Sequence, residues 1–336
     1  MEQISIGNSG LTTSRVGLGS WAIGGWMWGG TDEAQSIATI RAAVEQGITL
    51  IDTAPVYGFG RSEEIVGKAL AGGLRDSVTI ATKVGIAWQD GKPYRDSRRQ
   101  RIVQELEDSL RRLRTDVIDL YQVHWPDPQT PLEETGLALE DLLRQGKIRA
   151  IGVSNFSPRQ MESFRAVATL DAVQPPYNLF EREIEADVLP YAAASGLTVL
   201  SYGALCRGLL SGRMKADTTF ADGDLRRVDP KFQGTRFRHY VAAVKQLATL
   251  ARGRFDRSVL ALAVRWVLDQ GPTIALWGAR NPEQLRAIRE IEGWRIDDAT
   301  RRDIDSILQR HILDSVPPTF MAPPEGRPRQ QKMAVG

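Results

Sequence analysis

The sequence predicts a single (β/α)8 TIM barrel, a closed ring of eight parallel strands surrounded by helices. Three observations predict this α/β fold class. Short β-rich apolar runs alternate with amphipathic helical patterns along most of the 336 residues. Strands separated by helices of about 10–15 residues are typical of βαβ units with right-handed crossovers. Eight such units over roughly 280 residues fit a closed barrel better than an open doubly wound sheet.

The expected strands are short apolar runs rich in Val, Ile, Leu and Ala. They span residues 16–19, 48–52, 77–83, 117–124, 148–153, 172–174, 197–202 and 273–276. The clearest helix between them is 101–113, for which Ser97 is the expected N-cap. Ser157-Pro158 predicts another helix start, because proline suits the first helical position. Gly146 predicts a helix end directly before the fifth strand.

Three additions to the barrel are expected. Residues before Thr13 would form a two-stranded β-hairpin that plugs the barrel floor. Between the seventh and eighth strands, loop 207–235 precedes an inserted helix at 237–250 and the barrel helix at 258–268. An extra helix would close the barrel domain, residues 1–316, and a proline-rich, partly disordered tail would follow at 317–336.

Composition excludes several classes of protein. With 43 basic and 41 acidic residues, the net charge of +2 is too small for a nucleic-acid-binding stripe. The basic pairs at 98–99 and 111–112 stand near Glu105, Glu107 and Asp108, which predicts a solvated helix face. A single cysteine and three scattered histidines argue against a disulfide or a metal site. No targeting segment or membrane span is evident, so we expect a cytoplasmic protein.

One dinucleotide-binding pattern is misleading. Gly17, Gly19 and Ala22 match the GxGxxA pattern after a strand. A Rossmann turn must open a helix, so that the pyrophosphate meets free backbone N–H groups. Here the chain continues as IGGWMWGG, with glycines and tryptophans in no helical register. We therefore expect this turn to shape a pocket wall and not to start a Rossmann unit.

Four chemically distinctive side chains fall at strand ends. Asp52 ends the second strand, Lys83 the third and His124 the fourth, and Tyr57 follows Asp52 by five residues. In a barrel, the C-terminal strand ends and the loops after them all face one pocket. Each residue alone has an ordinary interpretation as a cap or a surface group, but their joint placement predicts a catalytic site.

The chemistry of these four groups is that of a proton donor. A phenol is a poor acid at neutral pH unless a neighbouring ammonium favours its anion. A carboxylate beside that ammonium keeps it charged in a partly buried site. An imidazole can then hold a substrate oxygen by a hydrogen bond. The set would protonate a developing alkoxide but contains no nucleophile, so it needs an external hydride source such as a nicotinamide.

Over about residues 3–315 the sequence resembles the aldo-keto reductases. The family motif DTAxxYG appears within IDTAPVYGFGRSEEIVG, which contains Asp52 and Tyr57. The segments KIRAIGVSNFS (147–157), QPPYNLFERE (174–183) and LSYGALCRGLLSG (200–212) also match. The chain is most similar to the bacterial branch of general stress reductases and glycerol or glyceraldehyde dehydrogenases. The resemblance implies a catalytic tetrad of Asp52, Tyr57, Lys83 and His124.

The same resemblance implies a nicotinamide site. Ser154, Asn155 and Gln174 would bind the carboxamide, and Tyr202 would stack on the nicotinamide ring. The pyrophosphate would lie against a glycine-bearing loop, whose residues permit close backbone approach. That loop comprises Gly203, Ala204, Leu205, Cys206, Arg207 and Gly208, with Arg213 beyond it. Further expected cofactor contacts are Gly19, Ser20, Trp21, Asp52, Gly278 and Ala279.

The segment after the eighth strand favours NADP(H) over NAD(H). Asn281 and Pro282 predict a helix start there, and Gln284 would complete a capping-box-like turn. A helix N-terminus at this place is a frequent phosphate site. Arg280 beside it has a planar fork suited to a 2′-phosphate, helped by Gln284 and by Arg286.

Tryptophans are expected at the mouth of the barrel. Five of the eight lie in the loops there and would form an apolar wall for a small carbonyl or alcohol substrate. They are Trp21, Trp26, Trp28, Trp88 and Trp125. This pattern does not identify the substrate.

The leading hypothesis is an NADP(H)-dependent reductase of aldehydes and ketones, reversible toward small polyols. One alternative is a nicotinamide-binding regulatory subunit with little turnover, like the potassium-channel β subunits that resemble this family. The complete tetrad disfavours it. Another is an aldolase that forms a Schiff base on Lys83. That reaction needs an unpaired lysine, whereas Asp52 would keep Lys83 charged.

Overall fold

The computed structural model describes residues 1–326 and confirms the predicted barrel. Eight parallel strands close in the order β10-β11-β12-β3-β4-β5-β8-β9. All eight correspond to the predicted strands, with ends shifted by a few residues. They are β3 (Val16–Gly19), β4 (Leu50–Asp52), β5 (Thr79–Val84), β8 (Ile118–Val123), β9 (Ile148–Ser154), β10 (Ala172–Gln174), β11 (Thr198–Ser201) and β12 (Thr273–Gly278).

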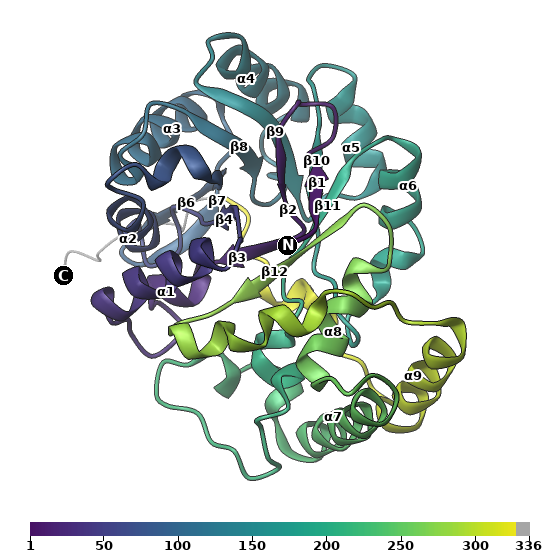
Figure 1. Cartoon of the computed structure of the whole chain (residues 1–336). Coiled ribbons are helices and arrows are strands. Elements are labelled where there is room, and N and C mark those ends of the chain that lie inside the picture. Colours follow the sequence, from purple (N-terminus) through teal and green to yellow (C-terminus); the bar gives the residue numbers. More distant parts are fainter. Residues whose placement is uncertain (327–336) are drawn as a thin grey trace, which may run out of the picture.

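Helices surround this ring, one after each strand (Figure 1). The seven α-helices of the ring are α1 (Glu33–Glu45), α2 (Arg61–Ala69), α3 (Arg99–Leu113), α4 (Leu132–Arg144), α5 (Pro158–Arg165), α6 (Val188–Ala194) and α8 (Val259–Leu268). The eighth position, after β12, is occupied by a 3₁₀ helix, η7 (Pro282–Ile291). Two further helices, α7 (Gly234–Phe255) and α9 (Asp298–His311), pack together outside the ring, as the sequence predicts for an inserted and an extra helix.

The predicted N-terminal plug is also present. Strands β1 (Gln3–Ser5) and β2 (Thr12–Ser14) form an antiparallel hairpin across the barrel floor, near the N-terminus in Figure 1. Ile6 at its turn is completely buried among barrel-interior side chains such as Leu50 and Leu120. The hairpin therefore seals the end opposite the expected pocket.

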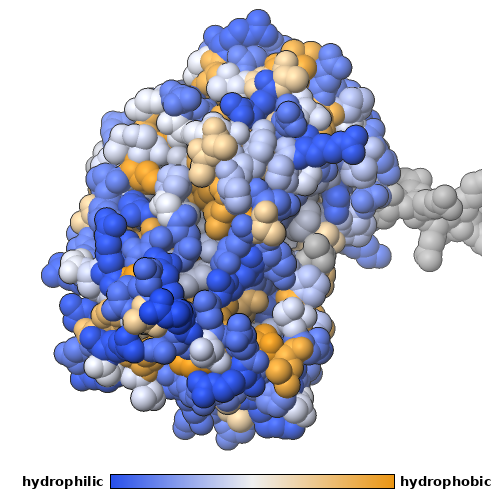
Figure 2. All heavy atoms as spheres, turned by 90° about the vertical axis from the view of Figure 1, so that its right-hand side faces the viewer, coloured by the Kyte–Doolittle hydropathy of each residue, from blue (hydrophilic) through white to orange (hydrophobic). Residues whose placement is uncertain are grey.

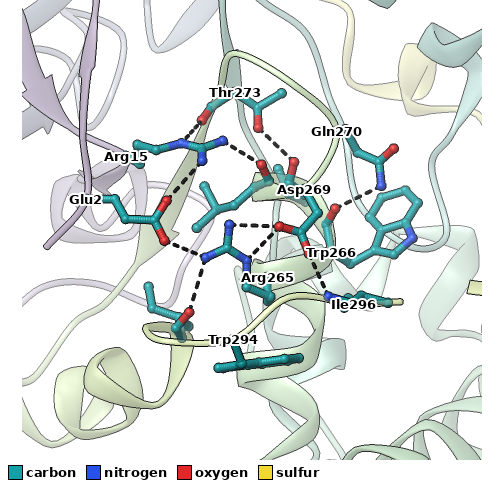
Figure 3. A network of polar contacts seen from close by, with 12 residues as sticks. Glu2, Arg15, Arg265, Trp266, Asp269, Gln270, Thr273, Trp294 and Ile296 are labelled. Atoms are coloured by element: carbon teal, nitrogen blue, oxygen red, sulfur yellow. Dashed lines mark hydrogen bonds and ion pairs between the residues drawn. The ribbon is translucent and has the colours of Figure 1, made fainter. Parts of the chain in front are cut away.

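An ionic network ties this hairpin to α8 (Figure 3). One Glu2 oxygen lies 2.6 Å from Arg265 Nη1, and the other lies 3.0 Å from Arg15 Nη1. Arg265 is buried and also pairs with Asp269, at 2.8 Å. The Glu2 side chain is 40% exposed, but Arg265 is buried, so loss of its partners would leave an uncompensated charge, and these contacts help to hold the hairpin on the barrel.

Two predicted helix starts are present and one is wrong. Ser157 forms a full capping box with Gln160, and Asn281 caps η7 through a bond from Gln284 N. In a capping box, Gln284 Oε1 would accept from the backbone N–H of Asn281. It accepts instead from the backbone N–H of Arg280. The N-cap position of helix α3 is Arg98, one residue after the predicted Ser97, and its side chain makes no cap; the buried Ser97 hydroxyl has no hydrogen-bond partner among residues 1–326.

The prediction of a solvated face on α3 is also partly wrong. Glu105 is buried and accepts from Arg101 and from the Gly85 N–H. Arg112 pairs at 2.6 Å with Glu63, which is buried on α2. The sequence pattern did not show that α2 and β5 pack against this part of α3. Their packing buries Glu105 and Glu63 in the interior.

A short hairpin that the sequence analysis missed follows β5. Strands β6 (Ile86–Gln89) and β7 (Lys92–Arg95) are antiparallel and joined through Asp90-Gly91. Asp-Gly between two such runs is a strong hairpin signal, so this element was open to prediction. The hairpin carries Trp88 and stands at the mouth of the barrel.

Figure 2 shows the face on the right of Figure 1, where hydrophilic residues predominate and hydrophobic ones form small separate patches. Among residues 1–326, no helix combines the length and apolar character needed to cross a bilayer. Within the same residues, His, Cys, Asp and Glu side chains form no group of three that could hold a metal ion.

Of the predicted tail 317–336, residues 317–326 lie in the described part of the chain. Residues Pro318–Met321 form a 3₁₀ helix, η8, and the segment after it returns to the barrel mouth. Arg95 on β7 holds it, because its backbone N–H donates to Pro324 O and its Nε to Pro323 O, both at 3.0 Å. The disorder predicted for the end of the tail falls on 327–336, outside the described residues.

Candidate active site

The four residues predicted to form the tetrad meet at the C-terminal ends of neighbouring strands. Asp52 is the last residue of β4, Lys83 lies near the end of β5, and His124 directly follows β8. The loop after β4 brings Tyr57 over them, with its ring 5.7 Å from that of His124 in an edge-on arrangement. Lys83 Nζ lies 5.1 Å from the centre of the Tyr57 ring.

Lys83 is completely buried beneath Tyr57 and has two partners there. Its Nζ donates to Asp52 Oδ1 at 2.7 Å and to the Thr53 carbonyl at 3.0 Å. Burial lowers the pKa of Lys83 from its usual value of 10.5, and the Asp52 carboxylate opposes that shift. The pairing therefore preserves an ammonium at a position where an isolated amine would lose its proton.

The electrostatics of Tyr57 differ from the sequence-based expectation. Burial, with a smaller contribution from the Asp52 charge, raises the pKa of Tyr57 well above 10.0. The neighbouring ammonium was expected to favour the phenolate, but desolvation dominates in this site. Tyr57 is thus a neutral phenol at physiological pH and carries the proton that reduction of a carbonyl would need.

His124 is neutral as well. Burial and the Lys83 charge together hold the pKa of His124 well below its usual 6.5. A neutral imidazole keeps one N–H donor and one acceptor nitrogen. It can therefore hold a substrate oxygen without supplying a competing positive charge.

The residues expected to bind the carboxamide form one hydrogen-bonded group beside the tetrad. Gln174 Nε2 donates to Asp52 Oδ2 at 2.9 Å, and Ser154 Oγ donates to the backbone carbonyl of Gln174 at 2.7 Å. Asn155 Nδ2 donates to the His124 carbonyl at 3.0 Å, and Tyr202 OH donates to Asn155 Oδ1 at 2.9 Å. These bonds set the side chains of three strands around a common centre.

A cavity of about 390 Å³ opens above this group. Tyr57 and His124 line it, and so do the residues expected to bind the carboxamide. Asp52 and Lys83 are buried beneath its floor. Most of the remaining wall is apolar. It includes Trp21, Trp26, Met27, Val56, Ile86, Pro93, Trp125, Leu225 and Val228.

Three of the five tryptophans predicted at the mouth line the cavity and two do not. Trp21, Trp26 and Trp125 belong to the wall. Trp28 stands behind Trp21, edge-on at 5.4 Å, and Trp88 packs 5.6 Å from Phe59 on the outer side. The segments that carry Trp28 and Trp88 do lie at the mouth, as predicted. Their positions in the sequence did not show whether each ring faces the cavity.

The cavity also has a wall that the sequence analysis missed. Phe320, Met321, Ala322, Pro323 and Pro324 of the C-terminal segment line it from above. The Phe320 ring lies 5.4 Å from the Arg207 guanidinium and 5.4 Å from Lys231 Nζ. The aromatic and apolar residues within the proline-rich stretch were a signal that this segment packs.

The glycine-bearing loop after β11 is built on buried charges. Gly203 and Gly208 have φ of 70° and 87°, in the region that favours glycine. Arg207 lies 2.6 Å from Asp229 and 3.3 Å from Glu181, and Lys231 lies 2.8 Å from Glu181. Ala204 and Leu205 are buried beside this network.

Cys206 is buried in the same loop. Burial raises the pKa of its thiol to about 12, so the packed thiol keeps its proton at physiological pH.

Arg280 lies near the start of η7 but already has partners. Its Nη1 donates to the Trp28 carbonyl at 2.9 Å and its Nη2 to the Gly30 carbonyl at 2.7 Å. Gly278 before it is exposed, and an added Cβ there would meet no atom within 4 Å. The backbone at this strand end is therefore open to a ligand.

Other predicted cofactor residues lie around the cavity at varied depth. Ser20 is buried and its Oγ donates to the Asp52 carbonyl at 2.8 Å, so it supports the strand end. Gly19 ends β3, and Ala279 is buried after β12. Arg213 is exposed and does not line the cavity.

These features together fit a dinucleotide with a flat, amide-bearing ring. The Tyr202 ring and three side chains with amide or hydroxyl groups line the cavity, and Gly203 and Gly208 give the neighbouring loop its positive φ angles. A phenol and an imidazole thus line one cavity beside the amide and hydroxyl groups that could hold such a molecule.

Comparisons with known proteins identify the family of the chain. The model of the aldo/keto reductase family matches residues 15–309. Aldo-keto reductase YhdN of Bacillus subtilis is 60% identical over 96% of this chain and 98% of its own length. The NADH-specific methylglyoxal reductase of Escherichia coli is 35% identical over 94% of this chain and 99% of its own.

Among solved structures, the glycerol dehydrogenase AKR11B4 of Gluconobacter oxydans superposes with a TM-score of 0.87. It is 55% identical, and the match covers 95% of this chain and 99% of that one. The fold, the juxtaposed side chains and these similarities lead to one conclusion. The chain belongs to the aldo/keto reductase family of oxidoreductases.

Proposed function

We propose that this protein is an NADP(H)-dependent reductase of aldehydes and ketones that also oxidises small alcohols and polyols in reverse. One observation carries the proposal. Tyr57, held as a neutral phenol, lines the cavity beside neutral His124, and the Asp52-paired ammonium of Lys83 lies directly beneath it. This arrangement suits protonation of a carbonyl oxygen.

Each side chain has a distinct role in the proposed reaction. When bound, the dinucleotide would supply the hydride to the carbonyl carbon. Neutral His124 donates a hydrogen bond that orients the substrate oxygen toward Tyr57. The Tyr57 O–H bond breaks and its proton passes to the oxygen as negative charge develops there.

Lys83 supports the phenolate that this proton transfer leaves on Tyr57. An ammonium at this distance favours the ionised phenol, and Asp52 keeps the lysine charged in its buried position. In alcohol oxidation the same groups act in the opposite sense, and the Tyr57 phenolate accepts the proton.

The wall of the cavity favours uncharged substrates. Arg207 is the one Lys, Arg, Asp or Glu side chain in the lining formed by residues 1–326, and two buried carboxylates pair with it. A charged substrate group would be desolvated there without a free partner. The names of the glycerol dehydrogenase and methylglyoxal reductase relatives also concern small uncharged molecules.

The preference for NADP(H) rests on Arg280 and the N-terminus of η7. Asn281 caps η7 by accepting from the Gln284 N–H, and the exposed Gly278 stands just before this turn, where a phosphate would meet the start of a helix. The E. coli relative is named as NADH-specific, so members of this family differ in this choice. Arg280 would have to share its guanidinium between a 2′-phosphate and the carbonyls it now holds.

Steady-state kinetics test the proposal. Rates are measured with NADPH and with NADH against glyceraldehyde, methylglyoxal, aromatic aldehydes and, in reverse, glycerol. We expect turnover of uncharged carbonyls and higher kcat/KM with NADPH. Cofactor binding without turnover of any carbonyl would favour a regulatory subunit instead. A cytoplasmic location also stays a proposal, and cell fractionation tests it.

A further inference from the structure

We propose that Gln122 is a positioning residue that fixes the plane of the Gln174 amide and so aims its carbonyl oxygen into the cavity, toward the carboxamide of the nicotinamide ring. This inference rests on the proposed cofactor. Gln122 lies on β8 and is completely buried, and it does not line the cavity. It would therefore act on the cofactor only through Gln174.

A glycine in strand β9 leaves room for the side chains of Gln122 and Gln174 to meet. Gln122 on β8 and Gln174 on β10 stand on either side of β9. Gly152 of β9 is in register with Gln122. A Cβ on Gly152 would lie 2.8 Å from Gln122 Cγ and 3.3 Å from its Oε1. Because residue 152 is a glycine, the Gln122 side chain has room to extend across β9.

The carboxylate of Asp52 dictates the direction of every bond in this group. An ionised carboxylate only accepts, so the Gln174 atom 2.9 Å from Asp52 Oδ2 is its Nε2. The second N–H of that amide points to Gln122 Oε1 at 3.3 Å. Gln122 Nε2 in turn lies 3.5 Å from Asp52 Oδ2, which orients Gln122 itself.

Two hydrogen bonds fix the plane of the Gln174 amide, whereas a single one would let the amide rotate about that bond. With both N–H groups of Gln174 engaged inside the barrel, its Oε1 is left as an acceptor on a residue that lines the cavity. Among the described residues, no group donates to that oxygen. A ring carboxamide carries the N–H₂ donor that would satisfy it, so Gln122 aligns the site before the cofactor binds.

The test compares two ligands that differ only in this donor. NADP⁺ carries a carboxamide, and its 3-acetylpyridine analogue carries a methyl group in place of the NH₂. Dissociation constants are measured by quenching of tryptophan fluorescence, without turnover. The wild type should bind NADP⁺ about tenfold more tightly than the analogue, the size of one well-made hydrogen bond.

In Gln122→Leu this preference should fall to about twofold, mainly because NADP⁺ binds more weakly. Gly152→Ala offers a second route, because its Cβ displaces the Gln122 side chain without removing the amide. Tyr121→Phe is the matched control. Tyr121 precedes Gln122 on β8, is buried, and its hydroxyl has no partner among residues 1–326, so its loss should leave the preference intact.

The outcomes separate the two proposals. A folded wild type that binds neither dinucleotide contradicts the proposed function. A wild type that prefers NADP⁺, with the same preference in Gln122→Leu and in Gly152→Ala, overturns the role of Gln122. Should Gln122→Leu fail to fold by circular dichroism, Gly152→Ala decides alone. A wild type that binds both ligands equally also overturns the inference, because no carboxamide donor is then recognised.

Discussion

Lys83 Nζ lies 2.7 Å from Asp52 Oδ1, and both side chains are almost completely buried. The ion pair is placed on two neighbouring strands, β4 and β5, by residues 31 positions apart. Its buried position means that Asp52 determines whether Lys83 carries a charge. The chemistry proposed for Tyr57 therefore depends on a residue that does not line the cavity.

Asp52→Asn should impair both catalysis and stability. Without the carboxylate, burial favours a neutral Lys83, which no longer stabilises the Tyr57 phenolate. We expect kcat to fall by roughly two orders of magnitude and the free energy of unfolding by about 3 kcal/mol.

Asp119→Asn is the control for this variant, with kcat measured beside urea unfolding. Asp119 is buried on the outer side of β8 and pairs with Arg75 and Arg149. Its loss should lower stability but leave kcat within about twofold. Equal kcat in the two variants would show that the Asp52–Lys83 pair is only structural.

Arg280→Ala tests the choice of cofactor. Loss of a phosphate contact should weaken NADPH binding by about tenfold or more and leave NADH binding unchanged. The measurement is the dissociation constant of each cofactor by fluorescence titration. If the residue serves only to hold the Trp28 and Gly30 carbonyls, both cofactors should weaken equally. An equal loss would therefore count against the 2′-phosphate contact.

Phe320→Ala tests the C-terminal wall of the cavity. Removal of the ring takes apolar contact from bulky substrates, so KM for an aromatic aldehyde should rise by about five- to tenfold. KM for methylglyoxal, which is much smaller, should change little. Val103→Ala, an exposed apolar residue on α3, is the control and should alter neither value. A uniform rise for both substrates would show that Phe320 does not select among them.

Local patterns were sufficient to predict the barrel and its tetrad. The eight strands are short apolar runs with helical patterns between them, and a closed parallel sheet brings their C-terminal ends together without further information. Asp52, Lys83 and His124 needed only that rule, since each stands at a strand end. The N-terminal plug and the helices α7 and α9 also followed from local patterns.

What the sequence did not reveal depends on packing between distant segments. The Phe320–Pro324 wall requires contact with Arg95 and Arg207, which lie far away in the chain. The orientations of Trp28 and Trp88 depend on neighbouring rings from other loops. The dominance of burial over the Lys83 charge at Tyr57 could be judged only once the depth of the site was known.

Glu105 gives a test of stability against pH. Burial raises the pKa of Glu105 from 4.5 to about 7, so the folded state holds this proton more tightly than the unfolded chain. Its contribution to stability is therefore present at low pH and is lost as the pH rises through that range. Glu105→Gln should remove this loss.

The measurement is urea unfolding of wild type and Glu105→Gln at about pH 5 and pH 8. Relative to wild type, the variant should gain roughly 1–3 kcal/mol between the two pH values. Glu107→Gln, half-exposed on the same helix and paired with Lys147, is the control and should show no such gain. A constant difference between Glu105→Gln and wild type would mean that Glu105 is ionised in the folded state throughout.

The most direct test of the proposed mechanism is Tyr57→Phe, with kcat for reduction of an uncharged aldehyde measured beside the dissociation constant of NADPH. The substitution removes only the hydroxyl and leaves the ring between Trp21 and His124. We predict that kcat falls by roughly three orders of magnitude or more while NADPH affinity stays within about twofold. A variant that keeps most of its turnover would contradict the assignment of Tyr57 as the proton donor.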